Sequence, residues 1–232
     1  MARKVAFHCL HWDNVDPRMV DAHKKVMKHF DLEVRYHGLN LNHGLWMNSV
    51  LRSADGDVIV FIEPDCIPLN KQAAPDAIRF AEKHGTFVGL AQVANHIPPK
   101  SHIYAAPGFF VIARSAYERL GRPSFSETAR SDTAEELSYL AEEKGLRYRA
   151  LLPTHFEGQS SEGLWPLGPL GYYGIGTVFQ GGVYHLYRSR LAEHVELFLK
   201  RCGEVVDGTF STEGFHPSAA FAYEERSLKV PL

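Results

Sequence analysis

The sequence of 232 residues lacks several features that would assign it to a specialised class. It has only three cysteines, Cys9, Cys66 and Cys202, which are scattered and form no CxxC pair. An odd set without regular spacing indicates reduced thiols and argues against a disulfide framework. No apolar run approaches the roughly 18 residues of a membrane-spanning helix, and the apolar part of the N-terminal stretch is too short for a signal peptide. These absences predict a soluble, cytoplasmic protein.

Familiar phosphate-binding and metal-binding patterns are also absent. No GxxxxGK[ST] or GxGxxG loop occurs, so a nucleotide would have to be held by a metal and by the ends of loops. Thirteen histidines are present, but none are spaced as HxH or HExxH, which argues against a zinc hydrolase. The formal net charge of −2 provides no bulk attraction to nucleic acid or to an anionic membrane.

What is present predicts one α/β domain. The chain is 45% hydrophobic and 22% charged, which is typical of a globular protein with one sizeable core. Apolar strands alternate with amphipathic helices, which predicts a single-domain three-layer α/β/α sandwich with a mostly parallel mixed sheet. The expected strands are 4–10, 32–36, 58–62, 86–91, 108–113, 146–152 and 177–187. The first expected helix begins at Asp16, and five more are expected at 43–53, 70–84, 115–120, 132–144 and 190–201. Loops are expected at 92–106 and 154–176. The domain is expected to span residues 1–202, with 203–232 as a tail or docking arm.

The stretch from His43 to Leu69 is the most informative part of the chain. Val58–Ile62 is an unbroken β-branched and aromatic run, as expected of a strand buried on both faces. Glu63 and Asp65 follow it directly, and charge at the end of a buried strand is costly unless it is compensated. Ligands of open α/β sheets bind at the carboxyl ends of strands, and Mg²⁺ and Mn²⁺ favour oxygen ligands. The pair therefore predicts a divalent-cation site; the alternative is a structural turn.

This stretch resembles the helix–strand–acidic-motif segment of the GT-A glycosyltransferases, particularly those of family 2. The resemblance is carried by Gly44, Asn48, Gly56-Asp57, the apolar strand and Glu63-Pro64-Asp65, with Glu63 standing where the family has Asp. It implies the Rossmann-like GT-A fold and a nucleotide-sugar donor. It also implies Mn²⁺ or Mg²⁺ held by Asp65, with Glu63 and the late His185 as further ligands.

The implied reaction is the transfer of a hexosyl or pentosyl unit to an acceptor by direct displacement with inversion. Such a reaction needs a carboxylate that accepts the proton of the acceptor hydroxyl. Asp132 best matches the family's base motif, and Glu135 or Glu136 could replace it by register. The competing interpretation is a helix capping box, in which Asp132 is the N-cap and Glu135 its partner three residues later.

The resemblance further implies contacts with the nucleotide and its diphosphate. The candidates lie in the loops after the first two strands, in the helix before the acidic motif, in the motif itself and after His185: Cys9, His11, Tyr36, His37, Asn48, Glu63, Asp65 and Arg188. The acceptor stays open among a glycan, a small molecule, a protein and a modified nucleic-acid base. Two other functions remain: a sugar-phosphate nucleotidyltransferase, and a non-catalytic nucleotide-sugar-binding protein of the same fold.

Overall fold

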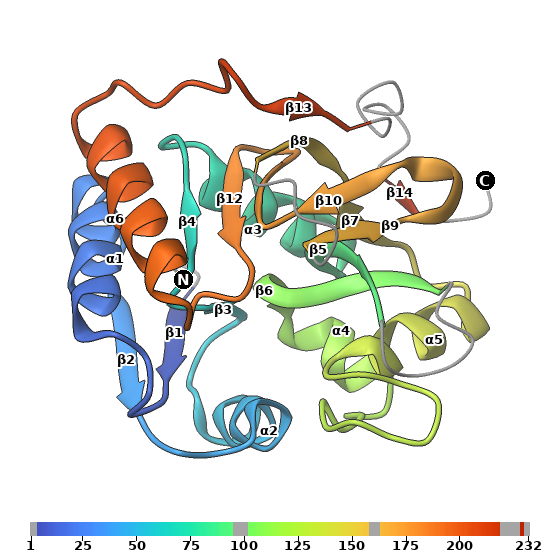
Figure 1. Ribbon diagram of the computed structural model, residues 1–232. Helices are drawn as coiled ribbons and strands as arrows, with labels where there is room; N and C mark the ends of the chain where they lie inside the picture. The colour runs from blue at the N-terminus through green and yellow to red at the C-terminus, as the bar shows by residue number, and fades with distance from the viewer. Residues whose placement is uncertain (1–3, 95–101, 158–162, 219–227, 230–232) are drawn as a thin grey trace.

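The computed structural model describes residues 4–94, 102–157, 163–218 and 228–229. Its centre is a seven-stranded sheet with the order β14-β7-β5-β6-β3-β1-β2 (Figure 1). The strands are β1 (Val5–His11), β2 (Val34–Gly38), β3 (Val58–Ile62), β5 (Phe87–Val93), β6 (Ile103–Ala113), β7 (Tyr148–Leu151) and β14 (Leu228–Lys229).

Most strands of this sheet point the same way. β1 pairs in parallel with β2 and β3, and β5 pairs in parallel with β7. β6 is antiparallel to both β3 and β5, so that β5 runs parallel to β3. β14 pairs antiparallel with β7. The predicted mostly parallel mixed sheet is confirmed.

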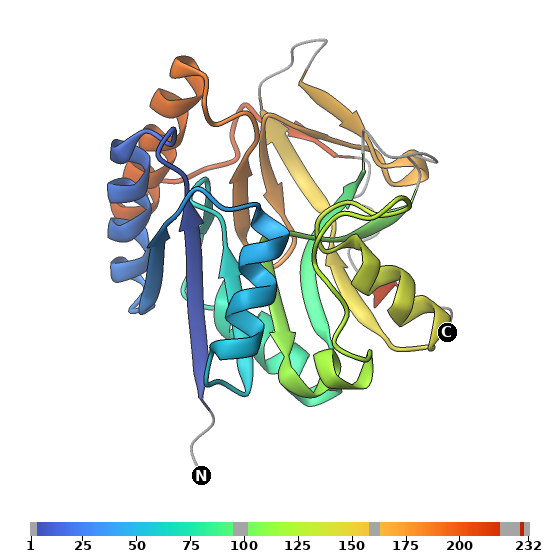
Figure 2. The same ribbon diagram turned by 90° about the horizontal axis from the view of Figure 1, so that it is seen from below.

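Helices cover both faces of the sheet and make the three predicted layers. On one face lie α1 (Pro17–His29) and α3 (Ala73–His84), with α6 (Ala192–Val206) packed beside α1 (Figure 1). The other face is covered by α2 (His43–Ser53), α4 (Arg114–Arg119) and α5 (Glu135–Glu143), which lie nearer the viewer in Figure 2. β3 is buried along its whole length because Val58, Val60 and Ile62 enter the first core while Ile59 and Phe61 enter the second.

A second, antiparallel sheet packs against the carboxyl ends of the central strands. Its order is β13-β8-β11-β12-β4, formed by β13 (His216–Pro217), β8 (Pro153–Glu157), β11 (Gly176–Phe179), β12 (Val183–Leu186) and β4 (Cys66–Pro68). A hairpin of β9 (Leu164–Pro166) and β10 (Tyr172–Gly174) adds a small third sheet around a 3-10 turn at Gly168–Leu170. The expected loop at 154–176 is therefore wrong. These strands of two to five residues are too short to show a period in the sequence.

Other boundaries also shift. β6 begins at Ile103, so the loop expected at 92–106 is wrong at both of its ends, while residues 95–101 lie outside the described part. The expected strand at 177–187 is two strands joined by a turn. α6 continues to Val206 and so crosses the boundary predicted at residue 202, and β13 and β14 pair with β8 and β7. Among the described residues, none of the helices combines the length and apolarity needed to span a bilayer.

Helix α2, which precedes β3 and the acidic pair, packs closely against a neighbouring loop at its N-terminal end. A Cβ at Gly44 would lie 2.6 Å from the backbone oxygen of Phe125, so the helix and the 124–126 loop approach more closely than any other residue permits. The amide of Asn48 fastens the same loop, because its Oδ1 accepts from the Phe125 N–H at 2.9 Å and its Nδ2 donates to Ser124 at 2.9 Å. The resulting support holds α2 against the face of the sheet on which Trp46 packs against Phe61 of β3.

Candidate active site

Two carboxylates and an imidazole converge at the carboxyl end of β3. Glu63 and Asp65 follow that strand, and β12 pairs with β4 in a register that sets His185 opposite Cys66, next to Asp65. His185 Nε2 lies 3.3 Å from Glu63 Oε2 and 3.4 Å from Asp65 Oδ1. One ligand atom from each of the three side chains lies within 4.8 Å of the others. His43, at the start of α2, adds a contact of 3.1 Å from its Nδ1 to Glu63 Oε1.

The electrostatics of the cluster are those of a buried ionic group. Burial favours the neutral acid, but hydrogen bonds from His185 and His43 outweigh it and lower the pKa of Glu63. Burial likewise opposes protonation of His185, but hydrogen bonds with Asp65 and Glu63 raise its pKa to about 9. The imidazolium is thus the cation that compensates the carboxylates within the chain.

The donor set fits a divalent cation. Asp65 Oδ1 is buried and, apart from its ion pair with His185, has no hydrogen-bond donor among the described residues. Carboxylate oxygen suits Mg²⁺ and Mn²⁺, and imidazole suits the transition metals. Glu63 and Asp65 can therefore hold a cation of this kind, together with His185 once its ring has given up the proton that it carries here. The ligands do not dictate the choice between Mn²⁺ and Mg²⁺.

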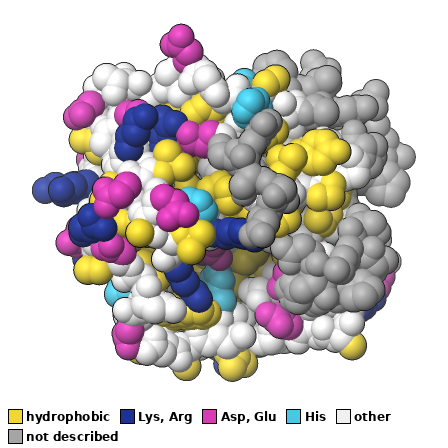
Figure 3. Space-filling view, viewed as in Figure 1, with side chains coloured by type: hydrophobic (Ala, Val, Ile, Leu, Met, Phe, Trp, Pro, Cys, Tyr) yellow, Lys and Arg dark blue, Asp and Glu magenta, His cyan; other side chains and the backbone are white. Residues whose placement is uncertain are grey.

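The cluster opens into a cavity of about 650 Å³ that also contains Asp132 and Arg188. Figure 3 shows acidic, basic and histidine side chains gathered around a hollow near the centre of this face. A smaller cavity of about 170 Å³ adjoins it, because both are lined by His43, Glu63, Asp65, Ser189 and Arg190. His11, the last residue of β1, and Trp12, which follows it, line only the smaller cavity. The two cavities share the acidic cluster as a common wall.

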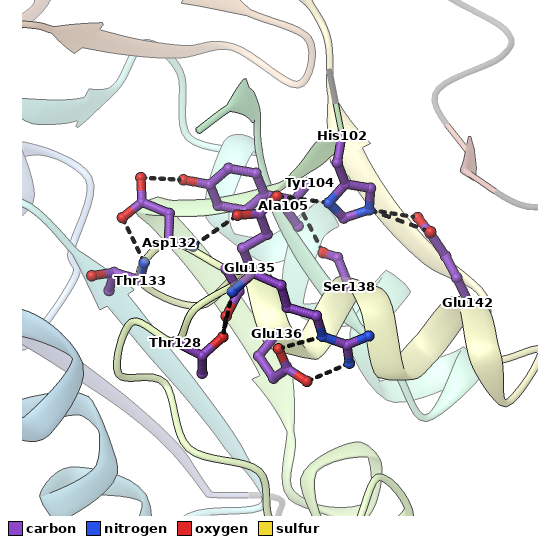
Figure 4. A network of polar contacts seen from close by, with 12 residues as sticks. His102, Tyr104, Ala105, Thr128, Asp132, Thr133, Glu135, Glu136, Ser138 and Glu142 are labelled. Carbon is purple, nitrogen blue, oxygen red and sulfur yellow. Dashed lines mark hydrogen bonds and ion pairs between the residues drawn. The ribbon is translucent and has the colours of Figure 1, made fainter. Parts of the chain in front are cut away.

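The three candidates for the base separate in space (Figure 4). Asp132 lines the large cavity. Glu135 is 1% exposed and is turned towards His102 and the backbone of Asp132. Glu136 pairs with Arg130 at 2.5 Å, and this ion pair lowers its pKa. The expected capping box, with Asp132 as the N-cap residue, is wrong. The helix α5 begins at Glu135, so its N-cap residue is Ala134, which has a left-handed φ of 66°. Asp132 is the base candidate that reaches the cavity.

Four of the predicted nucleotide contacts lie elsewhere. Cys9 has no exposed surface and belongs to the core under α1, where burial raises the pKa of its thiol. Tyr36 faces the same core, with its hydroxyl 2.7 Å from His23 Nδ1. The Nε2 of His37 lies 3.0 Å from His8, and Asn48 holds the 124–126 loop. None of these four side chains lines either cavity. Alternation along β1 and β2 turns Cys9, Tyr36 and His37 into the helical layers and away from the sheet edge.

His43 and Tyr104, which sequence reasoning did not assign to the site, line the large cavity together with the basic side chains Arg188 and Arg190. The only sequence signal at His43 was its place as the first residue of the helix expected at 43–53. Tyr104 lies in a stretch expected to be loop, and it gave no signal. Arg190 lines both cavities, and its guanidinium lies 4.8 Å from the ring centre of Trp12. Arg188 has a left-handed φ of 56°, a conformation that is uncommon for a non-glycine residue and accumulates at functional sites.

Replacing Gly108 is expected to disturb the cluster of Glu63, Asp65 and His185. A Cβ at this position would lie 3.1 Å from Cε1 and 3.2 Å from Nδ1 of His185, so Gly108→Ala displaces the imidazole. We expect Mn²⁺ affinity, measured by calorimetry, to fall about tenfold, the lower end of the effect of disturbing the support of a metal ligand. Gly203→Ala is the matched control, because a Cβ there meets nothing within 4 Å. Equal affinities in the two variants would contradict this view of the site.

Comparison with known proteins reveals likeness in structure only. No family model and no curated protein matches the sequence. A mannosyltransferase from Pyrobaculum calidifontis in complex with GDP-Man and Mn²⁺ superposes with a TM-score of 0.43 and 11% identity, over 62% of this chain and 52% of that chain. A Drosophila galactosyltransferase mutant in complex with manganese, UDP-Gal and xylobiose has a TM-score of 0.44 and 14% identity, over 63% and 64%. A197 from STIV has a TM-score of 0.44 and 16% identity, over 79% and 93%.

The chain thus spans about half the length of the mannosyltransferase and 64% of the galactosyltransferase. With TM-scores below 0.5 and identities of 16% or less, these neighbours say nothing by themselves about activity. The expected three-layer α/β/α architecture is confirmed by the strand order and the helices of the structure itself. In this chain it consists of a mostly parallel sheet between two helical layers, with an acidic pair at the carboxyl end of β3 and a second sheet that brings His185 to it.

Proposed function

We propose that the protein is a metal-dependent glycosyltransferase that moves a hexosyl or pentosyl unit from a nucleotide sugar to an acceptor hydroxyl. The observation that carries the proposal is one cavity of about 650 Å³ that holds Glu63, Asp65 and His185 together with Asp132 and Arg188. A cation site alone is compatible with simple ion binding. A cation site that shares a cavity with a separate carboxylate and with basic side chains has the parts that group transfer from a diphosphate requires.

The side chains have distinct parts in this proposal. Glu63, Asp65 and His185 would hold Mn²⁺ or Mg²⁺, which when bound neutralises the diphosphate of the donor and stabilises it as the leaving group. Arg188 and Arg190 contact phosphate oxygens as charge-assisted donors. His11 and Trp12 offer surfaces for the nucleoside in the adjoining cavity, where an aromatic face accepts any base.

Asp132 is the general base of the proposal. Its carboxylate accepts the proton of the acceptor hydroxyl as that oxygen attacks the anomeric carbon, so the reaction inverts the configuration at that carbon. Asp132→Asn keeps the size of the side chain and removes its basicity. We expect turnover to fall about 10²-fold, while the affinities for Mn²⁺ and for the donor stay within twofold of wild type. Unchanged turnover would remove Asp132 from the mechanism.

Binding of donor and metal tests the proposal directly. UDP-galactose and GDP-mannose are screened by thermal shift with Mn²⁺ and with EDTA, because a ligand present at 100 times its Kd stabilises a protein by about 2.7 kcal/mol. We expect one of the donors to raise the melting temperature with Mn²⁺ and not with EDTA, and to be turned over slowly by transfer to water. Pyrophosphate release from a sugar 1-phosphate and a nucleoside triphosphate would instead indicate a nucleotidyltransferase. Metal-dependent binding without turnover would indicate a binding protein.

A further inference from the structure

Glu135 occupies an unusual position for a carboxylate. Its side chain is 2% exposed, yet its two oxygens have different partners that belong to different parts of the fold. Oε1 lies 2.8 Å from His102 Nδ1, and Oε2 accepts the backbone N–H of Asp132 at 2.7 Å (Figure 4). A buried charge of this kind is costly unless it is paired and hydrogen-bonded, and removing one partner leaves it uncompensated.

His102 compensates that charge. Its Nε2 lies 3.2 Å from Oε1 of Glu142, which in turn accepts the hydroxyl of Tyr148 at 2.6 Å. Both ring nitrogens of His102 thus face carboxylate oxygens, which accept hydrogen bonds. The ring also stacks on Tyr139, with centroids 3.8 Å apart and planes 14° from parallel. His102 is thus fixed in place just before β6.

The Asp132 carboxylate is held by two donors of its own. Oδ1 accepts the N–H of Thr133 at 2.6 Å, and Oδ2 accepts the hydroxyl of Tyr104 at 3.3 Å. Burial, together with the nearby Asp132 and Glu135, raises the pKa of Tyr104, so this hydroxyl keeps its proton and remains a donor. Tyr104 lines the large cavity beside Asp132.

The backbone around Asp132 needs such support. Ala134 is left-handed, with φ at 66°, so the chain turns sharply between Asp132 and the first residue of α5. No side chain caps α5, and the Glu135 carboxylate reaches back over this turn to the N–H of Asp132 instead. Without that bond, the backbone of the segment that carries Asp132 loses its link to Glu135 and, through Glu135, to His102.

We propose that Glu135 and His102 are positioning residues, which hold Asp132 in the orientation that general-base catalysis requires, while Tyr104 orients its carboxylate from within the cavity. This inference rests on the proposed function, with Asp132 as the base. Glu135 therefore acts through the backbone of Asp132 and does not itself accept the proton of the acceptor. Displacing a catalytic group by about 1 Å costs on the order of 10²-fold in rate, so loss of the support appears in kcat.

Glu135→Gln tests the inference, because it removes the charge that pairs with His102 and places an amide where an acceptor is required. Turnover of UDP-galactose or GDP-mannose with Mn²⁺ is followed by nucleoside diphosphate release. We expect kcat to fall at least about tenfold, with KM for the donor and the Mn²⁺ affinity within twofold of wild type. Glu143→Gln is the matched control on the same helix, because its carboxylate is half exposed and, among the described residues, pairs with Arg130 alone at the surface.

If Glu135 had a purely structural role, Glu135→Gln would lower the melting temperature but would not lower kcat while leaving KM unchanged. Should Glu135→Gln fail to fold, Tyr104→Phe gives the same test by deleting one hydroxyl, and we expect it to lower kcat at least about threefold with KM unchanged. The inference is overturned if the folded variant has the kcat of Glu143→Gln. Failure of the wild-type protein to bind either donor with Mn²⁺ overturns the proposed function itself, which distinguishes the two outcomes.

Discussion

Replacing Asp65 with alanine is expected to reduce Mn²⁺-dependent turnover of a nucleotide sugar about 10³-fold. A bound cation contributes several kcal/mol of transition-state charge stabilisation, and about 1.36 kcal/mol corresponds to a factor of ten in rate. The substitution removes the carboxylate whose Oδ1 has only the His185 ion pair, and it leaves Glu63 as the remaining acid of the cluster. Steady-state release of the nucleoside diphosphate measures the change, and calorimetry measures the accompanying loss of Mn²⁺ affinity.

Asp21→Ala is the matched control for this variant. Asp21 lies on the outer side of α1, and its side chain is 68% exposed. Within the part of the chain that the structure describes, it pairs with Lys24 alone, at 3.4 Å. We expect it to keep the Mn²⁺ affinity and the turnover of wild type. If Asp65→Ala binds Mn²⁺ as tightly as Asp21→Ala does, the acids after β3 form a structural turn, and the proposed metal site is wrong.

Replacing Arg201 with methionine is expected to destabilise the fold by about 3–5 kcal/mol, the cost of breaking a buried ion pair by removing one partner. Arg201 on α6 is 11% exposed and forms a bidentate pair with Glu157 at the end of β8. It also donates to Glu204 at 2.6 Å, and its guanidinium lies 4.8 Å from the ring centre of Phe215. The substitution leaves the Glu157 carboxylate buried, with the Tyr184 hydroxyl as its main donor.

Urea unfolding measures this effect, with Lys200→Met as the control one residue away. Lys200 is 64% exposed and lies 3.8 Å from Glu204, so we expect its replacement to change the free energy of unfolding by less than about 1 kcal/mol. The double variant Glu157→Gln/Arg201→Met should regain part of the lost stability, because no unpaired charge then remains. If Arg201→Met is as stable as Lys200→Met, the ion pair between Arg201 and Glu157 does not hold α6 and the segment up to Phe215 on the second sheet.

Local patterns in the sequence were sufficient for the central layers. The helix at 43–53 and the strand at 58–62 occur with the predicted bounds, because an amphipathic period and an unbroken β-branched run are encoded in consecutive residues. Glu63 and Asp65 were found for the same reason, since their position follows from the strand before them. The second sheet was missed, because its short strands are defined by pairing with distant partners.

The choice among Asp132, Glu135 and Glu136 was beyond local reasoning. The three acids lie within five residues, and their directions depend on the left-handed turn at Ala134. They also depend on His102, which is 33 residues from Glu135 in the chain and beside it in space. Cys9 and Tyr36 line neither cavity for a related reason, because the alternation of each strand decides whether a residue near the strand end faces the cavity or a helical layer.

The sequence by itself determined the layered α/β architecture and the place of two acids at the end of its most hydrophobic strand, because both follow from hydrophobic periods within short segments. Only the tertiary structure decided which other side chains join those acids. His185 arrives through the pairing of β12 with β4, and Asp132 shares their cavity through the packing of α5 on β6. Contacts between such distant segments depend on strand register and helix packing, which no local pattern specifies.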